Sequence, residues 1–235
     1  LGLSGRSALN FLKKKNVKKI YTWDDKKNKN NKKKFNLFKK ALDIVDYIVI
    51  SPGISIEKTK FKLKLSRNNK KIITDLDLFY MQKIPVKSIV ITGTNGKSTA
   101  CKLTQHIFKT NRLDAQLGGN IGKPILDLKI GRKSVVIIEA SSFQLAYAKF
   151  IKPTLAVILN ITSDHLDWHN TITNYKNSKL KIFSKQDGND IALLNNKKLI
   201  KLFRRKNYSS KLKIVKKDIL NPLFKKKITN DYLIS

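Results

Sequence analysis

A short glycine-rich turn is the first place where this sequence could do chemistry. Gly93 and Gly96 lie in the run TGTNGKST, which follows the apolar stretch KSIVI and precedes a helical pattern. Such a turn presents backbone N–H groups and the positive end of a helix dipole to phosphate. Lys97 could reach the β- and γ-phosphates of a nucleotide, and the Ser98 hydroxyl could ligate Mg²⁺.

This turn departs from the full phosphate-loop motif, because Ile91 occupies the position of its first glycine. The alternative interpretation is an ordinary glycine turn that begins a helix with a serine cap. The apolar strand before the turn and the helical pattern after it favour the phosphate-binding interpretation.

Polar side chains also follow two other apolar runs. Glu139 ends SVVII, and Asp164 and His165 lie in LNITSDHLDWH, after TLAVI. Ligands bind at the carboxyl ends of strands in an open parallel sheet, so we expect these groups to meet the turn. A carboxylate, an imidazole and a hydroxyl at one edge predict a Mg²⁺-ATP site, in which Asp164 orients a neighbour or holds a metal-bound water. The other two histidines, His106 and His169, are expected to be structural or exposed.

The elements that must position these groups alternate between short apolar strands and longer amphipathic stretches, as in an α/β fold. Strands are expected at 17–23, 46–51, 71–74, 87–93, 134–140, 154–161 and 190–195. Helices are expected at 6–15, 75–83, 97–111 and 174–185, with a glycine turn at 1–5 and a polar loop at 26–34. The pattern predicts a Rossmann-like domain over 1–85 and a P-loop α/β domain with a mostly parallel sheet over 86–235.

The chain has a formal charge of +34, which ordinarily suggests an anionic polymer as partner. Only six of its 50 basic residues are arginine, the side chain that reads phosphates and bases bidentately. Lysine instead accompanies asparagine and isoleucine, a composition typical of an AT-rich genome, so we interpret the charge as solvated surface and expect no nucleic-acid partner. A P-loop NTPase acting on nucleic acid is the alternative, and it predicts DNA binding with a steep salt dependence.

No apolar run approaches the roughly 20 residues of a membrane span, and the first residues do not resemble a signal peptide. A single cysteine, Cys101, fits a reducing compartment and is expected to pack as a small residue on a helix. We therefore expect a cytoplasmic chain without a membrane partner. Since the sequence begins with leucine, we also expect it to start inside a longer protein.

Five motifs in order and spacing carry a resemblance to a known family. GTNGKST, GGNIGKP, EASSFQL, LNITSDHLDWH and YKNSKLKIF resemble the Mur ligases, the ATP-dependent enzymes that add amino acids to a UDP-linked peptidoglycan precursor. The serine after Lys97, the run SSFQL, and the N-terminal runs LGLSG and SPGI are similar to the member that adds D-glutamate. The resemblance implies a monomeric ligase that uses ATP to join D-glutamate to UDP-N-acetylmuramoyl-L-alanine through an acyl phosphate.

The resemblance also implies roles for individual residues. The catalytic residues would be Lys97, Asn120, Glu139, His165 and Lys179. The phosphates of ATP would be held by Thr94, Asn95, Gly96, Lys97, Ser98 and Thr99. One Mg²⁺ would be ligated by Ser98 and Glu139, and a second by His165 and a CO₂-derived carbamate on Lys179. The muramoyl substrate would contact Asn120, Ser141, Ser142 and Gln144, and its UDP end would contact Leu3, Ser4, Gly5, Ser51, Pro52 and Gly53. Asp24 and Asp25 lie where the family contacts uracil.

Composition alone does not single out Lys179 among so many lysines, but a carbamate requires a neutral amine and therefore a depressed pKa. The family has a third, C-terminal domain that we expect to be absent from this chain, so the isolated piece is expected to be inactive. Two further alternatives stay open. One is another ligase of the superfamily, such as a sibling Mur ligase or folylpolyglutamate synthase, and the other is a non-catalytic fragment that binds nucleotide.

Overall fold

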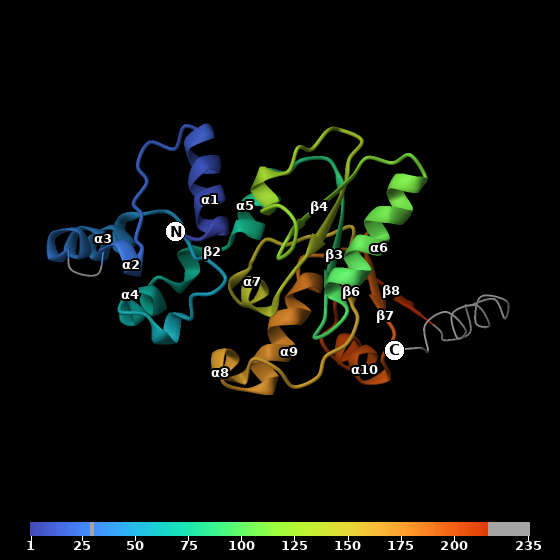
Figure 1. Ribbon diagram of the computed structural model, residues 1–235. Coiled ribbons are helices and arrows are strands. Elements are labelled where there is room, and N and C mark those ends of the chain that lie inside the picture. Colours follow the sequence, from blue (N-terminus) through green and yellow to red (C-terminus); the bar gives the residue numbers. More distant parts are fainter. Residues whose placement is uncertain (29–30, 216–235) are drawn as a thin grey trace, which may run out of the picture.

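A six-stranded parallel sheet organises the larger part of the molecule (Figure 1). The computed structural model describes residues 1–28 and 31–215. In spatial order the strands are β4 (Ala115–Gly119), β5 (Val135–Glu139), β3 (Lys87–Thr92), β6 (Leu155–Ile158), β7 (Ile191–Leu194) and β8 (Lys211–Ile214). Each neighbouring pair is parallel, so all carboxyl ends lie at one edge. Because β3 lies between β5 and β6, the loop after β3 occupies a switch point of the sheet, where α/β proteins bind ligands.

Alternating side chains of the strands bury the two faces of this sheet under different helices. Ile89, Ile91 and Ile137 pack with Cys101 of α6 (Lys97–Thr110) on one face. Val90 and Ile138 belong to the larger core on the other face. That core is covered by α7 (Ser142–Tyr147), α9 (Ile172–Leu180) and α10 (Lys197–Arg205). The short elements η3 (Ile125–Asp127), α8 (Leu166–His169) and η4 (Lys181–Phe183) complete this part.

The first part of the chain contains a separate sheet of two short parallel strands, β1 (Ile48–Val49) and β2 (Ile72–Ile73). Its helices are α1 (Leu3–Lys14), α2 (Asp25–Asn28), α3 (Lys32–Ile44), η1 (Ile56–Lys58), α4 (Lys62–Arg67), η2 (Asn69–Lys71) and α5 (Asp75–Met81). Phe61 packs against Trp23, Phe35 and Phe38 with ring centroids 5.0 to 5.3 Å apart. This aromatic cluster forms one side of a small core that also contains Ile72.

A buried carboxylate joins the two parts. Asp77 is fully buried in the first turn of α5, where it accepts a hydrogen bond from the Thr74 backbone N–H at 2.9 Å. Its other oxygen accepts hydrogen bonds from the backbone N–H groups of Lys149 and Phe150, at 2.8 and 2.7 Å. One side chain therefore caps a helix of the first part and binds the segment that follows α7.

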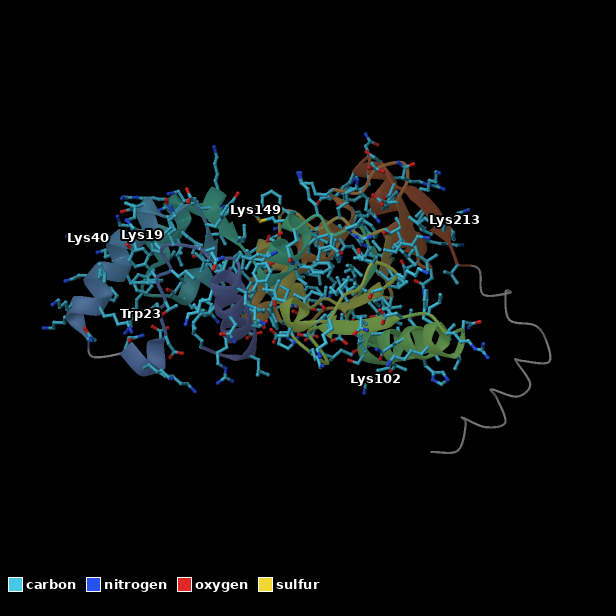
Figure 2. The ribbon with its side chains drawn as sticks, turned by 90° about the horizontal axis from the view of Figure 1, so that it is seen from above. Lys19, Trp23, Lys40, Lys102, Lys149 and Lys213 are labelled. Atoms are coloured by element: carbon cyan, nitrogen blue, oxygen red, sulfur yellow. The ribbon has the colours of Figure 1, made fainter. Side chains whose placement is uncertain are left out.

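The exposed lysines are spread over the whole molecule. Lys19, Lys40, Lys102 and Lys213 lie far apart on different elements (Figure 2), and all four are exposed. In residues 1–28 and 31–215, no helix is both long and apolar enough to cross a membrane.

The α/β class with a parallel sheet is confirmed, and so are all four strands predicted after residue 86, whereas β4 and β8 were not predicted. Helix α1 begins at Leu3, within the glycine turn predicted over 1–5 and before the predicted helix start at residue 6. The predicted strand at 46–51 shortens to Ile48–Val49. The predicted boundary near Pro85 falls between α5 and β3 and stays a prediction. Residues 216–235 of the predicted second domain lie outside the described part of the chain.

Two predictions about the first part are wrong. Residues 17–23 form no strand, because neither strand described in this part pairs with them, and Trp23 packs into the aromatic cluster instead. The polar run 26–34 contains helical turns because short polar side chains cap them. Asp24 accepts hydrogen bonds from the N–H groups of Lys26 and Lys27 before α2, and Asn31 caps α3 through the N–H of Lys34.

Candidate active site

The glycine-rich turn connects the end of β3 to the start of α6. Gly96 is the N-cap residue of α6, with a φ of 79°, a left-handed conformation that suits glycine. The first helical hydrogen bond runs from the Ala100 N–H to the Gly96 carbonyl, so the N–H groups of Lys97, Ser98 and Thr99 have no acceptor within the helix. These groups point to the end of the sheet and can bind an anion. The Lys97 ammonium donates to the Thr94 carbonyl at 2.7 Å, which keeps it folded over the turn.

Glu139 lies next to this turn, at the end of β5. Its carboxylate is 1% exposed and accepts hydrogen bonds from the Ser98 hydroxyl and from the Asn120 side-chain amide, both at 2.7 Å. The Asn120 backbone N–H also donates to the Glu139 carbonyl at 2.8 Å. Gly119 makes this approach possible, because a Cβ there would lie 2.3 Å from that carbonyl oxygen. The structure therefore brings together Ser98, Asn120 and Glu139, three predicted site residues that lie far apart in the sequence.

A carboxylate beside a serine hydroxyl and free helical N–H groups fits one Mg²⁺ with a nucleotide phosphate. Mg²⁺ takes one or two protein oxygens and fills its octahedral shell with water and phosphate oxygens. In the described residues, no three His, Cys, Asp or Glu side chains gather as a metal cluster. The Ser98–Glu139 pair is thus suited to a metal that arrives with its nucleotide, not to a closed structural metal site.

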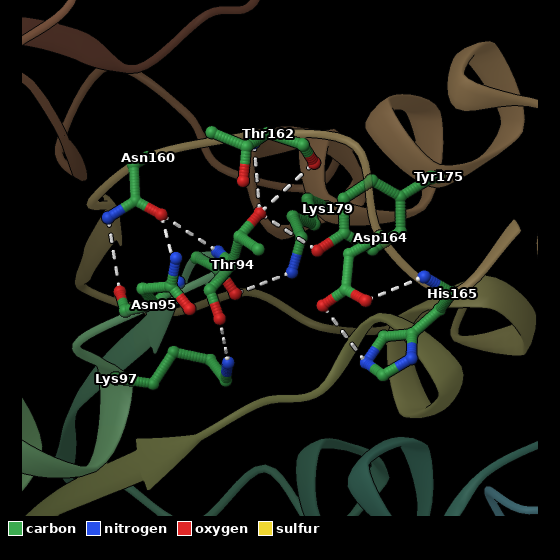
Figure 3. A network of polar contacts seen from close by, with 10 residues as sticks. Thr94, Asn95, Lys97, Asn160, Thr162, Asp164, His165, Tyr175 and Lys179 are labelled. Atoms are coloured by element: carbon green, nitrogen blue, oxygen red, sulfur yellow. Dashed lines mark hydrogen bonds and ion pairs between the residues drawn. The ribbon is translucent and has the colours of Figure 1, made fainter.

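Lys179 is buried on α9 and faces the same turn (Figure 3). Its Nζ donates to the Gly93 carbonyl at 2.7 Å and lies 4.6 Å from the centroid of the Tyr175 ring. Burial, and then the charge of Lys97, lower the pKa of Lys179 to about 7. This amine is therefore partly uncharged near neutral pH, unlike an ordinary lysine.

His165 lies at the rim of the site, and its polar partner is Asp164 rather than Lys179 or Glu139. Its side chain is 45% exposed, and its Nε2 lies 3.4 Å from Asp164 Oδ2. In Figure 3, Asp164 lies between His165 and Lys179. The His165 ring packs against Phe143 with centroids 4.8 Å apart. The predicted metal ligands therefore fall into a contacting pair, Ser98 with Glu139, and two separate residues, the buried Lys179 and the half-exposed His165.

Two residues of the site were not predicted from the sequence. Asn160 follows β6, and its side chain forms hydrogen bonds with Thr94 and Asn95 of the turn. The Tyr175 hydroxyl lies 3.0 Å from the Thr94 hydroxyl. Asn160 carries a readable signal, since it is a polar residue directly after a buried strand. Tyr175 does not, because it looks like an ordinary core residue of an amphipathic helix.

The predicted muramoyl-binding residues are engaged within the protein. The Ser141 hydroxyl accepts from the Gln144 N–H at 3.2 Å, and the Gln144 side chain accepts from the Ser141 N–H at 3.1 Å. This reciprocal pair is a capping box that starts α7. Ser142 is buried in the same turn. The sequence run SSFQL therefore has a structural role in addition to the predicted substrate contact.

The two N-terminal motifs predicted to bind UDP lie side by side. A Cβ at Gly5 would lie 3.2 Å from the Ser51 Oγ, so the start of α1 approaches the loop after β1. Leu3 is 71% exposed at this place. The neighbouring predicted residues are Ser4, which is half-buried, Pro52, also half-buried, and the exposed Gly53. Asp24 and Asp25 are occupied by helix capping and by a hydrogen bond from Trp23 Nε1, respectively.

The other two histidines and the cysteine lie buried in the core or exposed on a helix. His169 is buried, and burial lowers its pKa to about 4, so its ring is neutral and stacks on Phe143. Cys101 is fully buried, and burial raises the pKa of its thiol to about 12, which makes it an unreactive core residue. His106 is exposed on α6.

Comparison with known proteins identifies relatives of this chain. The family described as Mur ligase middle domain matches residues 91–231. The chain is 41% identical over 152 residues to the UDP-N-acetylmuramoylalanine--D-glutamate ligase of Rickettsia bellii. The aligned segment covers 64% of this chain and 33% of that protein. It is 36% identical over 196 residues to the enzyme of the same name from Aquifex aeolicus, and this segment covers 83% of this chain and 45% of that protein. The chain thus spans less than half the length of these relatives.

A solved structure supports the fold. The UDP-N-acetylmuramate:L-alanyl-gamma-D-glutamyl-meso-diaminopimelate ligase from Neisseria meningitides is similar with a TM-score of 0.50 and 14% identity, over 75% of this chain and 60% of that chain. The family match covers more than half of the 235 residues and includes the phosphate turn, Glu139, His165 and Lys179. On this evidence the chain belongs to the Mur ligase family.

Proposed function

We propose that this chain carries the nucleotide-binding and UDP-substrate-binding parts of an ATP-dependent ligase that joins D-glutamate to UDP-N-acetylmuramoyl-L-alanine. The observation that carries the proposal is the Ser98–Glu139 hydrogen bond of 2.7 Å beside the free N–H groups of α6. The names of the relatives from Rickettsia bellii and Aquifex aeolicus supply the amino acid and the acceptor.

The reaction needs two anions to approach each other. A carboxylate oxygen of the acceptor attacks the γ-phosphorus of ATP, ADP leaves, and an acyl phosphate forms. The amine of D-glutamate then attacks the acyl carbon and loses a proton, and phosphate leaves as the amide forms. Lys97 and the N-terminus of α6 would offset the negative charge of this approach. Ser98 and Glu139 would hold the Mg²⁺ that neutralises the phosphates when bound.

A second Mg²⁺ would be held by His165 and a carbamate on Lys179. The depressed pKa of Lys179, about 7, supports this part of the proposal, because only the neutral amine adds to CO₂ and releases a proton. The test is ¹³C NMR of the protein in ¹³C-bicarbonate. A carbamate signal that is lost in Lys179→Ala is the expected result, and no signal in the unaltered protein would contradict it.

The substrate would lie across the two parts of the molecule. Asn120, Ser141, Ser142 and Gln144 would face its muramoyl end. The UDP end would lie where α1 approaches the loop after β1, at Leu3, Ser4, Gly5, Ser51, Pro52 and Gly53. We further propose that the protein is a cytoplasmic monomer in which residues 1–85 and 86–235 form separate domains.

The experiment uses the protein extended along its gene at both ends, because the relatives are more than twice as long as the matched segment. It is incubated with ATP, Mg²⁺ and UDP-N-acetylmuramoyl-L-alanine, and with D-glutamate, L-alanine, diaminopimelate or lysine in separate reactions. Mass spectrometry then looks for the ligated product. A product with D-glutamate alone is expected. A product with another amino acid would indicate a sibling ligase, and ATP turnover stimulated only by DNA would contradict the proposal.

A further inference from the structure

The side chain of Asn160 spans the first half of the phosphate turn (Figure 3). Its Oδ1 accepts hydrogen bonds from the backbone N–H groups of Thr94 and Asn95, at 3.1 and 2.9 Å. Its Nδ2 donates to the Asn95 carbonyl at 3.1 Å. The Asn160 carbonyl also accepts from the Thr94 N–H at 3.0 Å. One residue on β6's exit loop therefore holds three backbone groups of a turn that follows β3.

The sheet does not need this side chain for its own pairing. The ladder between β3 and β6 already runs to its end through backbone bonds, including the Leu159 N–H to the Thr92 carbonyl at 3.0 Å. The amide of Asn160 acts beyond that point, where the chain has left the sheet. Its hydrogen bonds therefore determine the shape of the turn and not the register of the strands.

A second set of contacts holds the Thr94 side chain. Its hydroxyl accepts from the Thr162 N–H at 3.0 Å and lies 3.0 Å from the Tyr175 hydroxyl. Both ends of Thr94 are thus fixed from the exit of β6 and from α9. The N–H groups of Thr94 and Asn95 already have acceptors, whereas those of Lys97, Ser98 and Thr99 have none within the helix.

We infer that Asn160 is a positioning residue for phosphate binding. It holds the turn open before the nucleotide arrives, and it withdraws the N–H groups of Thr94 and Asn95 from the anion. The phosphates then contact the N–H groups of residues 96–99, beside Ser98 and Glu139. The inference rests on the proposed nucleotide-binding function, and it assigns the phosphate contact to the second half of the predicted turn only. A preformed site binds more tightly because less chain must be ordered on binding.

Hydrogen exchange tests the turn without any nucleotide. The measurement uses the 235-residue chain and follows the backbone amides of residues 91–100 by overlapping peptides or NMR. In Asn160→Ala, the amide of Asn95 should exchange at least tenfold faster, because it loses its acceptor. The amides of β5 should stay slow, and so should that of Thr94, which keeps the Asn160 backbone carbonyl as its acceptor. Asn189→Ala is the matched control, because Asn189 is exposed at the opposite edge of the sheet. Unchanged exchange at Asn95 in Asn160→Ala would overturn the inference.

A conservative variant separates positioning from general destabilisation. Asn160→Asp keeps the Oδ1 that accepts from the N–H groups of Thr94 and Asn95, and it replaces the Nδ2 donor to the Asn95 carbonyl with a second carboxylate oxygen. Its exchange at Thr94 and Asn95 should therefore remain close to that of the unaltered chain. If Asn160→Asp exchanged as fast as Asn160→Ala, the acceptor role would be wrong, even if Asn160→Ala proved unstable.

Nucleotide binding then tests the functional consequence. Titration with Mg²⁺-ATP should show about tenfold weaker binding by Asn160→Ala, the loss expected from about one hydrogen bond of ordering. Unchanged affinity together with faster exchange would overturn the positioning role. Lys97→Ala should bind more weakly with no change in exchange at Asn95. If the unaltered chain bound no Mg²⁺-ATP, the proposed function would fail, while the exchange results would still decide whether Asn160 holds the turn.

Discussion

Lys179 and Gly93 lie 86 positions apart in the chain, yet the Lys179 Nζ donates a hydrogen bond to the Gly93 carbonyl at 2.7 Å. The contact ties α9 to the first residue after β3, so the buried amine and the phosphate turn form one structural unit. Its energetic consequence follows from the pKa of Lys179, which burial lowers from 10.5 to about 7.

Stability should depend on pH through this lysine. Between pH 7 and 10.5 the unfolded chain holds a proton on Lys179 that the folded chain releases, so stability rises with pH in this window. Below pH 7 the cost of burying the charge is full. Relative to Lys179→Met, the unaltered protein should gain about 2 kcal/mol between pH 7 and 9. Urea unfolding at both pH values checks this, with the exposed Lys102→Met as the control. Parallel pH profiles for the unaltered protein and Lys179→Met would contradict it.

Ser98→Ala should weaken nucleotide binding only when Mg²⁺ is present. The Ser98 hydroxyl contacts Glu139 at 2.7 Å and is placed to ligate a metal, but its loss leaves the helical N–H groups unchanged. We expect about tenfold weaker Mg²⁺-ADP binding, in line with the loss of one polar contact, and nearly unchanged binding of ADP in EDTA. Ser184→Ala on the exposed surface is the control in titration calorimetry. An equal loss with and without Mg²⁺ would mean that Ser98 contacts phosphate and not metal.

Gly119→Ala should destabilise the fold by about 3 kcal/mol. Gly119 has a φ of 105°, and its added Cβ would lie 2.3 Å from the Glu139 carbonyl oxygen, a backbone atom that cannot move aside alone. Gly188→Ala is the matched control, because a Cβ there meets nothing within 4 Å. The free energy of unfolding in urea measures both, and Gly188→Ala should stay within about 0.5 kcal/mol of the unaltered protein. Equal stability of the two variants would show that the Asn120 turn can move away from β5.

Asp77→Ala should also cost about 3 kcal/mol, because it leaves three backbone N–H groups without an acceptor, the buried one of Thr74 and the partly buried ones of Lys149 and Phe150. The change removes the cap of α5 and the tie to the segment after α7 together. Urea unfolding followed by the fluorescence of Trp23 and Trp168 reports on both parts of the molecule. Asp46→Ala, at an exposed position, should have little effect. Loss of less than about 1 kcal/mol in Asp77→Ala would mean that water replaces the carboxylate.

Features that depend only on neighbouring residues could be predicted from the sequence alone. The runs at 134–140 and 154–161 are almost continuously apolar, as expected for strands buried on both faces of a sheet, and they form β5 and β6. The phosphate turn is equally local, because its glycines, the preceding strand and the following helix are contiguous. Five motifs in order sufficed to indicate the family, and the alternation of apolar strands with amphipathic stretches indicated the fold class.

Features that depend on residues far apart in the chain arise only when the sheet and its helices assemble. A strand exists only where another strand supplies its hydrogen bonds, so residues 17–23 form none, whereas the glycine-rich β4 pairs with β5 from Ala115 to Gly119. The burial of Lys179, the only lysine in the described residues that is almost fully enclosed, arises where α9 packs near the turn. The hold of Asn160 on Thr94 exists for the same reason, since the exit of β6 meets the exit of β3 only in the assembled sheet.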